Sequence, residues 1–147
     1  MRPIKNLFRQ EVSPLSDGKK GNQEFGGSIK NLTSLEIPSL PGVEKRIVFG
    51  PGRFWEDYVV RHFTVEPEAS TPFHNHDWPH YIIVLEGTAE ALIMGETLRL
   101  EAGSWAYVPP DSDHGFRNIG EGPLSFLCIV PRRGDPDADR QGFLERS

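Results

Sequence analysis

Four of the five histidines in this chain stand close together, at His74, His76, His80 and His114. A neutral imidazole offers a lone pair to a metal without the cost of burying a charge, and histidine is the commonest metal ligand among side chains. His74 and His76 are two residues apart, so on an extended strand both side chains leave the same face. The sequence therefore predicts a transition-metal site, and a fold that brings a local segment and a distant one to the same point.

The order of these histidines also predicts how the site is assembled. The three residues after His76 form a bend, so His80 opens the next strand and can face back towards the first two. His114 follows the turn at residues 110–113 and must approach from another strand. Such a site is pre-organised, because the strands fix most of its geometry before the metal binds.

Glycine and proline divide the chain into short segments, with 15 Gly and 13 Pro spread along it. From Arg53 onward these segments are rich in β-branched and aromatic residues, and no helical periodicity interrupts them. Short strands separated by turn residues at intervals of about 8 to 12 residues indicate an all-β sandwich or barrel. The predicted strands are residues 55–65, 81–86, 89–94, 97–100, 104–108, 114–118 and 124–130.

Composition limits the class of protein. With 147 residues, 37% of them hydrophobic and 25% charged, the chain can form one globular core. A net charge of −5 and the lack of a basic run argue against nucleic-acid or membrane partners. No apolar stretch approaches the roughly 20 residues that span a bilayer, and the polar N-terminus does not resemble a signal peptide. With one cysteine, Cys128, these features lead us to expect a cytoplasmic location.

We expect three regions along the chain. Residues 1–50 form an N-terminal extension with edge strands at 29–37 and 43–49 and a mobile, polar loop at 16–28. Residues 51–131 form the β-barrel. Residues 132–147 form a charged C-terminal tail, either exposed or folded into a short helix.

Two segments resemble the sequence motifs of the cupin superfamily, and in particular its small, single-domain monocupins. The first motif covers His74, His76, His80 and Gly87, and the second covers Gly103, Pro109, Asp111, His114 and Asn118. The resemblance extends over residues 59–131. It implies a double-stranded β-helix of the jelly-roll type, with a metal inside the barrel and open coordination positions. The alternative is a closed tetrahedral zinc that only stabilises the barrel.

The chain departs from the family pattern at three positions. Glu68 and Asp111 stand where the family usually has glycine, and both are turn positions. His80 stands where the family usually has glutamate, so the chain is similar to a four-histidine subset of monocupins that includes manganese-binding proteins. Four neutral imidazoles leave a divalent metal with its full charge, which favours an anionic oxygen as the next ligand. Nitrogen ligands select Mn, Fe, Co, Ni, Cu or Zn, and we favour Mn or Fe.

Four further residues are candidates for the substrate pocket. Strand alternation puts Phe116 on the same face as His114. The resemblance suggests that Phe126, Cys128 and Arg61 also point towards the metal, where Arg61 could pair with a substrate carboxylate. The alternatives are a core role for Phe126, a small buried hydrophobe for Cys128, and a solvent-facing side chain for Arg61.

The expected function is that of a metal-dependent oxidoreductase of the dioxygenase type, acting on a small oxygenated substrate that chelates the metal. Beyond the ligands, no catalytic residue is assigned. The alternatives are a metal-dependent lyase or isomerase of sugar acids, for which the sequence offers no convincing general base, and a non-enzymatic small-molecule-binding cupin. The family resemblance also implies a homodimer formed through sheet edges, with residues 29–49 exchanged between the copies.

Overall fold

The computed structural model describes residues 25–138 of the chain, which forms two compact units at residues 1–31 and 32–147. The described part of the first unit ends in the 3-10 turn η1 (Ile29–Asn31), where the Asn31 amide donates to the Ser28 carbonyl at 3.1 Å. Most of the predicted mobile loop and the end of the predicted tail lie outside the described residues. Within those residues, no helix has the length and apolar character needed to cross a membrane.

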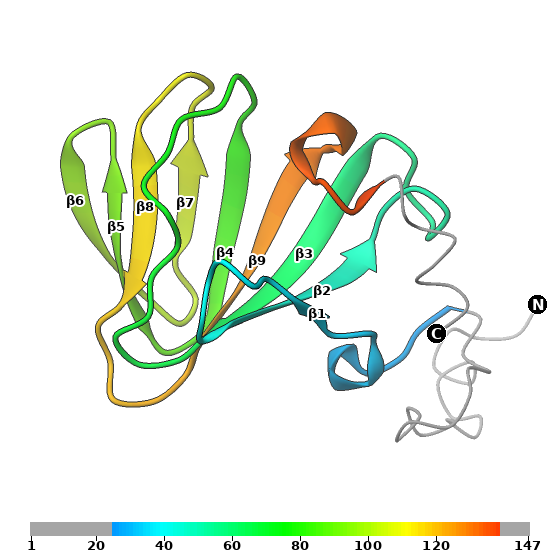
Figure 1. The fold of residues 1–147 in the computed structure, drawn as a ribbon, viewed down its shortest axis with the longest axis horizontal. Helices are drawn as coiled ribbons and strands as arrows, with labels where there is room; N and C mark the ends of the chain where they lie inside the picture. The colour runs from blue at the N-terminus through cyan, green and yellow to red at the C-terminus, as the bar shows by residue number, and fades with distance from the viewer. Residues whose placement is uncertain (1–24, 139–147) are drawn as a thin grey trace, which may run out of the picture. The chain divides into compact units, whose positions relative to one another are not determined.

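The described part of the second unit contains two antiparallel sheets (Figure 1). The larger sheet has the strand order β1-β2-β3-β9-β4-β7, and the smaller has the order β6-β5-β8. Their bounds are β1 (Leu35–Glu36), β2 (Val43–Phe49), β3 (Tyr58–Val65), β4 (His80–Glu86), β5 (Thr88–Ile93), β6 (Glu96–Glu101), β7 (Trp105–Val108), β8 (His114–Asn118) and β9 (Leu124–Pro131). The prediction of an all-β jelly-roll barrel is confirmed.

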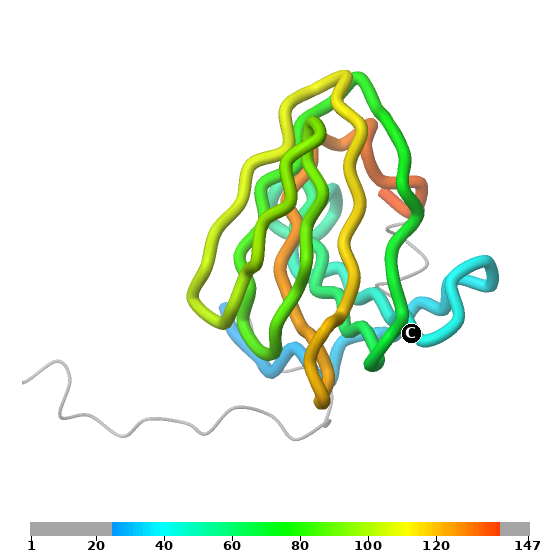
Figure 2. The backbone as a smooth tube through the Cα atoms, turned by 90° about the vertical axis from the view of Figure 1, so that its left-hand side faces the viewer, coloured from blue at the N-terminus to red at the C-terminus, as the bar shows by residue number. Residues whose placement is uncertain are grey.

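The segment between β3 and β4 runs alongside β8 and extends the smaller sheet (Figures 1 and 2). The amides of His74 and His114 each donate to the carbonyl of the other residue at 3.0 Å. Further along, the Thr71 amide donates to the Phe116 carbonyl at 2.9 Å. This pairing brings the two sequence motifs into direct contact.

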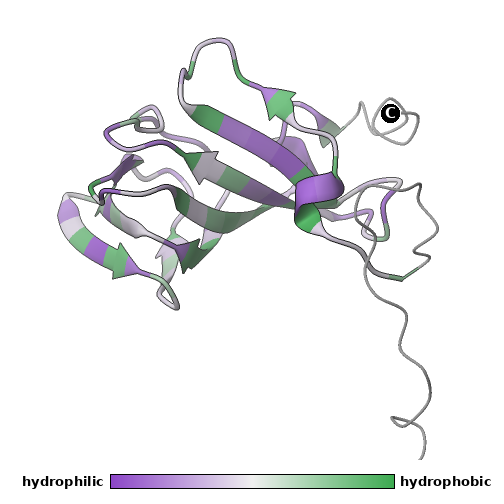
Figure 3. Cartoon of the chain, turned by 90° about the horizontal axis from the view of Figure 1, so that it is seen from below, coloured by the Kyte–Doolittle hydropathy of each residue, from purple (hydrophilic) through white to green (hydrophobic). Residues whose placement is uncertain are grey.

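The core lies between the inner faces of the two sheets. Because side chains alternate along a strand, every second residue of β5 is buried, as are His114, Phe116 and Asn118 on β8. Figure 3 shows hydrophilic and hydrophobic segments on the strands of both sheets. The most deeply buried large side chains are Leu124, Val59, Val65, Val84, Val108, Val130 and Asn118. The inward position of His114 therefore follows from the same alternation that builds the core.

Two predicted strands differ from those observed. The predicted strand at residues 29–37 is reduced to η1 and the two-residue β1. Polar residues that favour turns, such as Asn31 and Ser34, interrupt this segment. The strand predicted from residue 55 begins at Tyr58. Phe54 has a φ of 74° and directly follows a turn that is closed by the Arg53 amide donating to the Gly50 carbonyl at 2.7 Å.

The segment after β9 differs from an exposed tail. It begins with the 3-10 turn η2 (Arg132–Gly134), and the side chains of Asp135 and Ala138 are buried. Asp135 is held by Lys45 and Arg61, which lie on β2 and β3. Those partners are far away in the sequence, so no local pattern predicts the burial of Asp135.

Two of the departures from the family pattern have a clear backbone cause. Glu68 has a φ of 69° and Asp111 a φ of 59°, so both adopt the left-handed conformation that favours glycine. The family's usual glycines at these positions are therefore explained by the turn geometry. Aspartate is among the residues that tolerate this conformation best.

Gly87 provides a test of how tightly the turn between β4 and β5 is packed. Its φ is 85°, and a Cβ added there would lie 2.5 Å from the Pro123 carbonyl oxygen. We expect Gly87→Ala to lower the free energy of unfolding by about 3 kcal/mol, because backbone strain and a steric clash add together. Gly95→Ala is the matched control, since Gly95 has a φ of 80° with nothing near its added Cβ, and should cost only about 1 kcal/mol. Equal losses in urea unfolding would contradict this account.

Candidate metal centre

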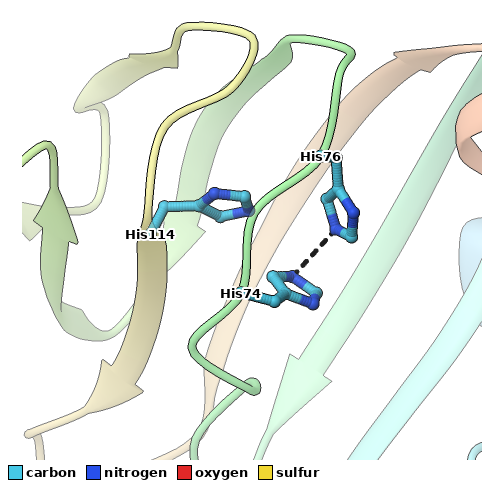
Figure 4. Close-up of side chains that lie close together, drawn as sticks. All are labelled: His74, His76 and His114. Atoms are coloured by element: carbon cyan, nitrogen blue, oxygen red, sulfur yellow. Dashed lines mark hydrogen bonds between the residues drawn. The ribbon is translucent and has the colours of Figure 1, made fainter.

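Three of the four predicted ligands gather at one point. His74, His76 and His114 each offer a ring nitrogen, and these atoms all lie within 4.8 Å of one another. The Nε2 atoms of His74 and His76 are 3.1 Å apart. Figure 4 shows His114 on β8 and the other two rings on the neighbouring segment, gathered on the same side of the backbone. The pairing of that segment with β8 is what holds them together.

The orientation of the His114 ring is set by a hydrogen bond to the backbone. Its Nδ1 donates to the Ser112 carbonyl at 2.9 Å, so Nε2 carries the free lone pair. Ser112 is itself held, because its hydroxyl donates to the Pro109 carbonyl at 2.7 Å. The turn before β8 thus presents one nitrogen of His114 to the site.

His80 lies close to this cluster but outside the group of three nitrogens. It is the first residue of β4 and is buried, with its ring centroid 4.7 Å from that of His114 and 5.5 Å from that of His76. Its Nδ1 lies 3.3 Å from the Cys128 Sγ. The structure therefore brings the ring nitrogens of three histidines together, and the role of His80 as the fourth ligand stays a prediction.

The residues present fit a transition metal. The Nε2 atoms of His80 and His114 are buried and have no hydrogen-bond partner, which is rare for polar atoms in a protein interior. Two neighbouring ligands at about 2.1 Å from one ion and at a right angle lie about 3.0 Å apart, close to the separation of the His74 and His76 nitrogens. An ion bound by these imidazoles would satisfy the unpaired atoms.

Two of the histidines, His74 and His80, are uncharged at neutral pH. Burial, followed by the charge of Arg61 and by neighbouring histidines, lowers the pKa of His80 to about 3. Burial and the neighbouring histidines, with a smaller effect of Arg61, lower the pKa of His74 to about 4. Because only the deprotonated imidazole binds a metal, these low values keep the ligands ready without a competing proton.

The cluster opens into a cavity of about 410 Å³. The four histidines line it. So do all four predicted pocket residues, which are Arg61, Phe116, Phe126 and Cys128. The other lining residues are Ile37, Leu40, Lys45, Phe63, Thr71, Pro72, Trp78, Ile82, Arg133, Gly134 and Pro136. Within the described residues, the lining contains three cationic side chains and no carboxylate. Its walls are otherwise largely apolar.

Arg61 faces inward, and its neighbour His62 does not line the cavity. The Arg61 guanidinium is buried and already engaged, donating from Nη2 to the Cys128 Sγ at 2.9 Å and from Nη1 to the Asp135 carboxylate at 3.2 Å. Burial raises the pKa of the Cys128 thiol despite the nearby Arg61, so the thiol stays protonated. A buried, protonated thiol is a weak nucleophile, which favours a packing role for Cys128.

Sequence reasoning missed two residues of this site, Lys45 and Asp135. The Lys45 ammonium lies 3.1 Å from the Asp135 carboxylate, and both side chains are buried. They begin a continuous line of contacts that passes through Arg61 and Cys128 to His80. A signal for Lys45 exists in the sequence, because it lies two residues from both Val43 and Ile47 and therefore shares their inward-facing side of the strand. Nothing in the sequence identifies Asp135.

Trp78 packs directly against one of the ligands. Its ring stacks on His76 with centroids 4.4 Å apart and planes 6° apart. The Arg133 guanidinium lies 5.7 Å from the Trp78 ring centroid and pairs with Asp77. The segment after β9 therefore supports the ligand segment through this indole.

Metal analysis of single variants tests the cluster. We expect His114→Ala and His76→Ala to reduce bound metal to below about a tenth of wild type, because each removes a donor atom. His62→Ala is the matched control, since His62 lies outside the cavity and should keep wild-type metal content. His80→Ala separates a three-histidine site from a four-histidine site. Full occupancy in the His114 variant, measured by elemental analysis, would contradict the site.

The buried ion pairs give a second prediction. Asp135→Asn removes the buried counter-charge of Arg61 and leaves Lys45 with its partly exposed partner Asp137, and we expect it to lower the free energy of unfolding by about 3 kcal/mol. Glu90→Gln is the control, because its pair with Arg117 is exposed and should be worth less than about 1 kcal/mol. Urea unfolding measures both, and similar small losses would show that the buried network is not needed for stability.

Comparisons with known proteins agree with the fold and the motifs. Residues 61–130 match the Cupin domain family. The chain is 36% identical over 118 residues to the alginate biosynthesis protein AlgA of Pseudomonas putida, covering 78% of this chain and 23% of that protein, so it spans about a quarter of that relative.

Solved structures give the same picture. The polyketide cyclase RemF from Streptomyces resistomycificus is similar with a TM-score of 0.64 and 26% identity, covering 71% of this chain and 76% of that one. A predicted oxalate decarboxylase from Thermotoga maritima has a TM-score of 0.64 at 18% identity, covering 71% and 96%, which is a likeness of fold. With both motifs meeting at one cluster inside a jelly-roll barrel, residues 61–130 of the chain form a cupin domain.

Proposed function

We propose that this protein is a metal-dependent oxidoreductase of the dioxygenase type, acting on a small oxygenated substrate whose neighbouring oxygens chelate the metal. His74, His76, His80 and His114 would hold a divalent transition metal, with manganese or iron favoured. The observation that carries the proposal is the position of the nitrogen cluster at the wall of a largely apolar cavity of about 410 Å³. A volume of that size suits a small organic ligand.

The metal and the protein's own residues would supply different parts of the chemistry. A bound metal supplies Lewis acidity at the substrate oxygens and, for manganese or iron, a route for electrons to dioxygen. The neutral imidazoles do not reduce the positive charge at the site, which favours anionic oxygen donors. Phe116 and Phe126 form apolar walls that exclude water from the bound substrate.

The cavity lining also favours one substrate class over another. Among the described lining residues, Thr71 is the only side chain with a hydroxyl group, and none is a carboxylate. A polyhydroxylated sugar acid would find few hydrogen-bond partners there, and a proton transfer from its carbon would lack a carboxylate base. A diketone, an enol or a catechol, with a polar chelating edge and an apolar body, fits the lining better.

A non-redox reaction on the same class of substrate is the second candidate. The likeness to a polyketide cyclase supports it, since that protein is 26% identical to this chain. In that case the metal would act as a Lewis acid only, and no oxygen would be consumed.

Oxygen uptake with a panel of substrates distinguishes these functions. Manganese- and iron-loaded protein is incubated with a 1,3-diketone, a catechol and a flavonol, and oxygen consumption is followed together with product mass. We expect metal-dependent uptake, with both atoms of labelled dioxygen in the product, and only background uptake with the His114→Ala variant. A product formed without oxygen uptake would favour the second candidate, and binding without turnover would favour a non-enzymatic binding protein.

A further inference from the structure

The sulfur of Cys128 lies between a buried cation and a buried histidine. The Arg61 Nη2 donates to the Cys128 Sγ at 2.9 Å, and the His80 Nδ1 lies 3.3 Å from the same sulfur. All three side chains are buried. The hydrogen bond between the sulfur and the imidazole is therefore shielded from water, which strengthens it.

Arg61 holds the Cys128 side chain in place. Its Nε donates to the Cys128 carbonyl at 3.5 Å, and its Nη1 donates to the Asp135 carboxylate at 3.2 Å. A guanidinium can only donate hydrogen bonds, so Arg61 occupies one lone pair of the sulfur and keeps the thiol proton away from that side. The sulfur has a second lone pair, which can accept a hydrogen bond from His80.

The other ring nitrogen of His80 indicates which tautomer the protein favours. Burial, followed by the charge of Arg61, lowers the pKa of His80 to about 3, so the ring is neutral and carries one N–H. A proton on Nε2 would be a buried donor without a partner, since this atom makes no hydrogen bond within the described residues. A proton on Nδ1 can be donated to the sulfur, which leaves Nε2 with a free lone pair beside the other histidines.

His114 has the same arrangement with a different acceptor. Its Nδ1 donates to the Ser112 carbonyl at 2.9 Å, and a carbonyl can only accept, so the proton lies on Nδ1. Its Nε2 is likewise buried and has no partner among the residues that the structure describes. A backbone oxygen behind one ring thus corresponds to a side-chain sulfur behind the other.

We propose that Cys128 is a positioning residue, whose sulfur accepts a hydrogen bond from the His80 Nδ1 and thereby leaves the His80 Nε2 free to bind the metal. The inference rests on the proposed function in one respect, because a free Nε2 serves metal binding only if the cluster holds a metal. Ligating histidines almost always donate their second ring N–H to an acceptor, and loss of such a partner typically weakens metal binding by roughly 10- to 100-fold. Here Cys128 is that acceptor, and Arg61 and Asp135 hold it there.

Nuclear magnetic resonance of the imidazole nitrogens in the labelled full chain tests the tautomer directly. In protein stripped of metal with a chelator, we expect both His80 and His114 to be protonated on Nδ1. Cys128→Ala should shift His80 towards the Nε2-protonated tautomer and leave His114 unchanged. Zinc titration of the same samples should give a dissociation constant about 10-fold higher for Cys128→Ala than for wild type.

Two further variants separate this role from packing. Cys128→Ser keeps an acceptor behind the ring, so it should retain the Nδ1-protonated tautomer of His80 and most of the zinc affinity. Val130→Ala is the matched control, since Val130 is buried on the same face of β9 but does not line the cavity. Both measurements should stay at wild-type values in this variant. Circular dichroism verifies that each variant is folded.

The inference is overturned if His80 of the wild-type protein carries its proton on Nε2, or if Cys128→Ala leaves the tautomer and the zinc affinity unchanged. An equal loss of zinc affinity in Val130→Ala also overturns it, since packing alone would then explain the effect. The proposed function fails in a different way. Nitrogen sites bind zinc more tightly than manganese or iron, so wild-type protein that shows the expected tautomer but binds no zinc would support the hydrogen bond and contradict the metal-dependent function.

Discussion

The pairing of residues 69–76 with β8 is the interaction on which the candidate site depends. Reciprocal backbone hydrogen bonds join His74 to His114, so two segments far apart in the sequence are held at strand spacing. Strand alternation then turns His114 inward, and its hydrogen bond to Ser112 aims the remaining nitrogen. The sheet does the positioning before any metal binds, because the backbone contacts do not require one.

Charge compensation behind the cluster is the second organising constraint. A buried lysine and a buried arginine would be very costly alone. Both pair with Asp135 from the segment after β9, and Lys45 also pairs with the partly exposed Asp137. The same arginine holds the Cys128 thiol, which contacts His80. The segment after β9 is thus connected to His80 in the cavity wall through the side chains of Arg61 and Cys128.

The sequence predicts the elements whose signals are local. The strands Val43–Phe49 and His114–Asn118 appear with the predicted bounds, because alternation and flanking turn residues define both. The start of β3 could not be predicted, since it depends on the backbone conformation of Phe54. The Lys45–Asp135 pair joins residues 90 positions apart, and the contact of His80 with Cys128 spans 48. Side-chain contacts over such distances depend on packing that a local pattern does not contain.

The stacking of Trp78 on His76 has a practical consequence. The indole packs closely against the backbone of Gly134, where an added Cβ would lie 2.8 Å from the Trp78 Nε1. This contact limits the movement of the ring. A shortened protein that ended at the last strand would still contain both cupin motifs. It would nevertheless lose Gly134, which packs against Trp78, and Asp135, which pairs with Lys45 and Arg61. A minimal version of this barrel must therefore extend beyond residue 130, where the match to the family ends.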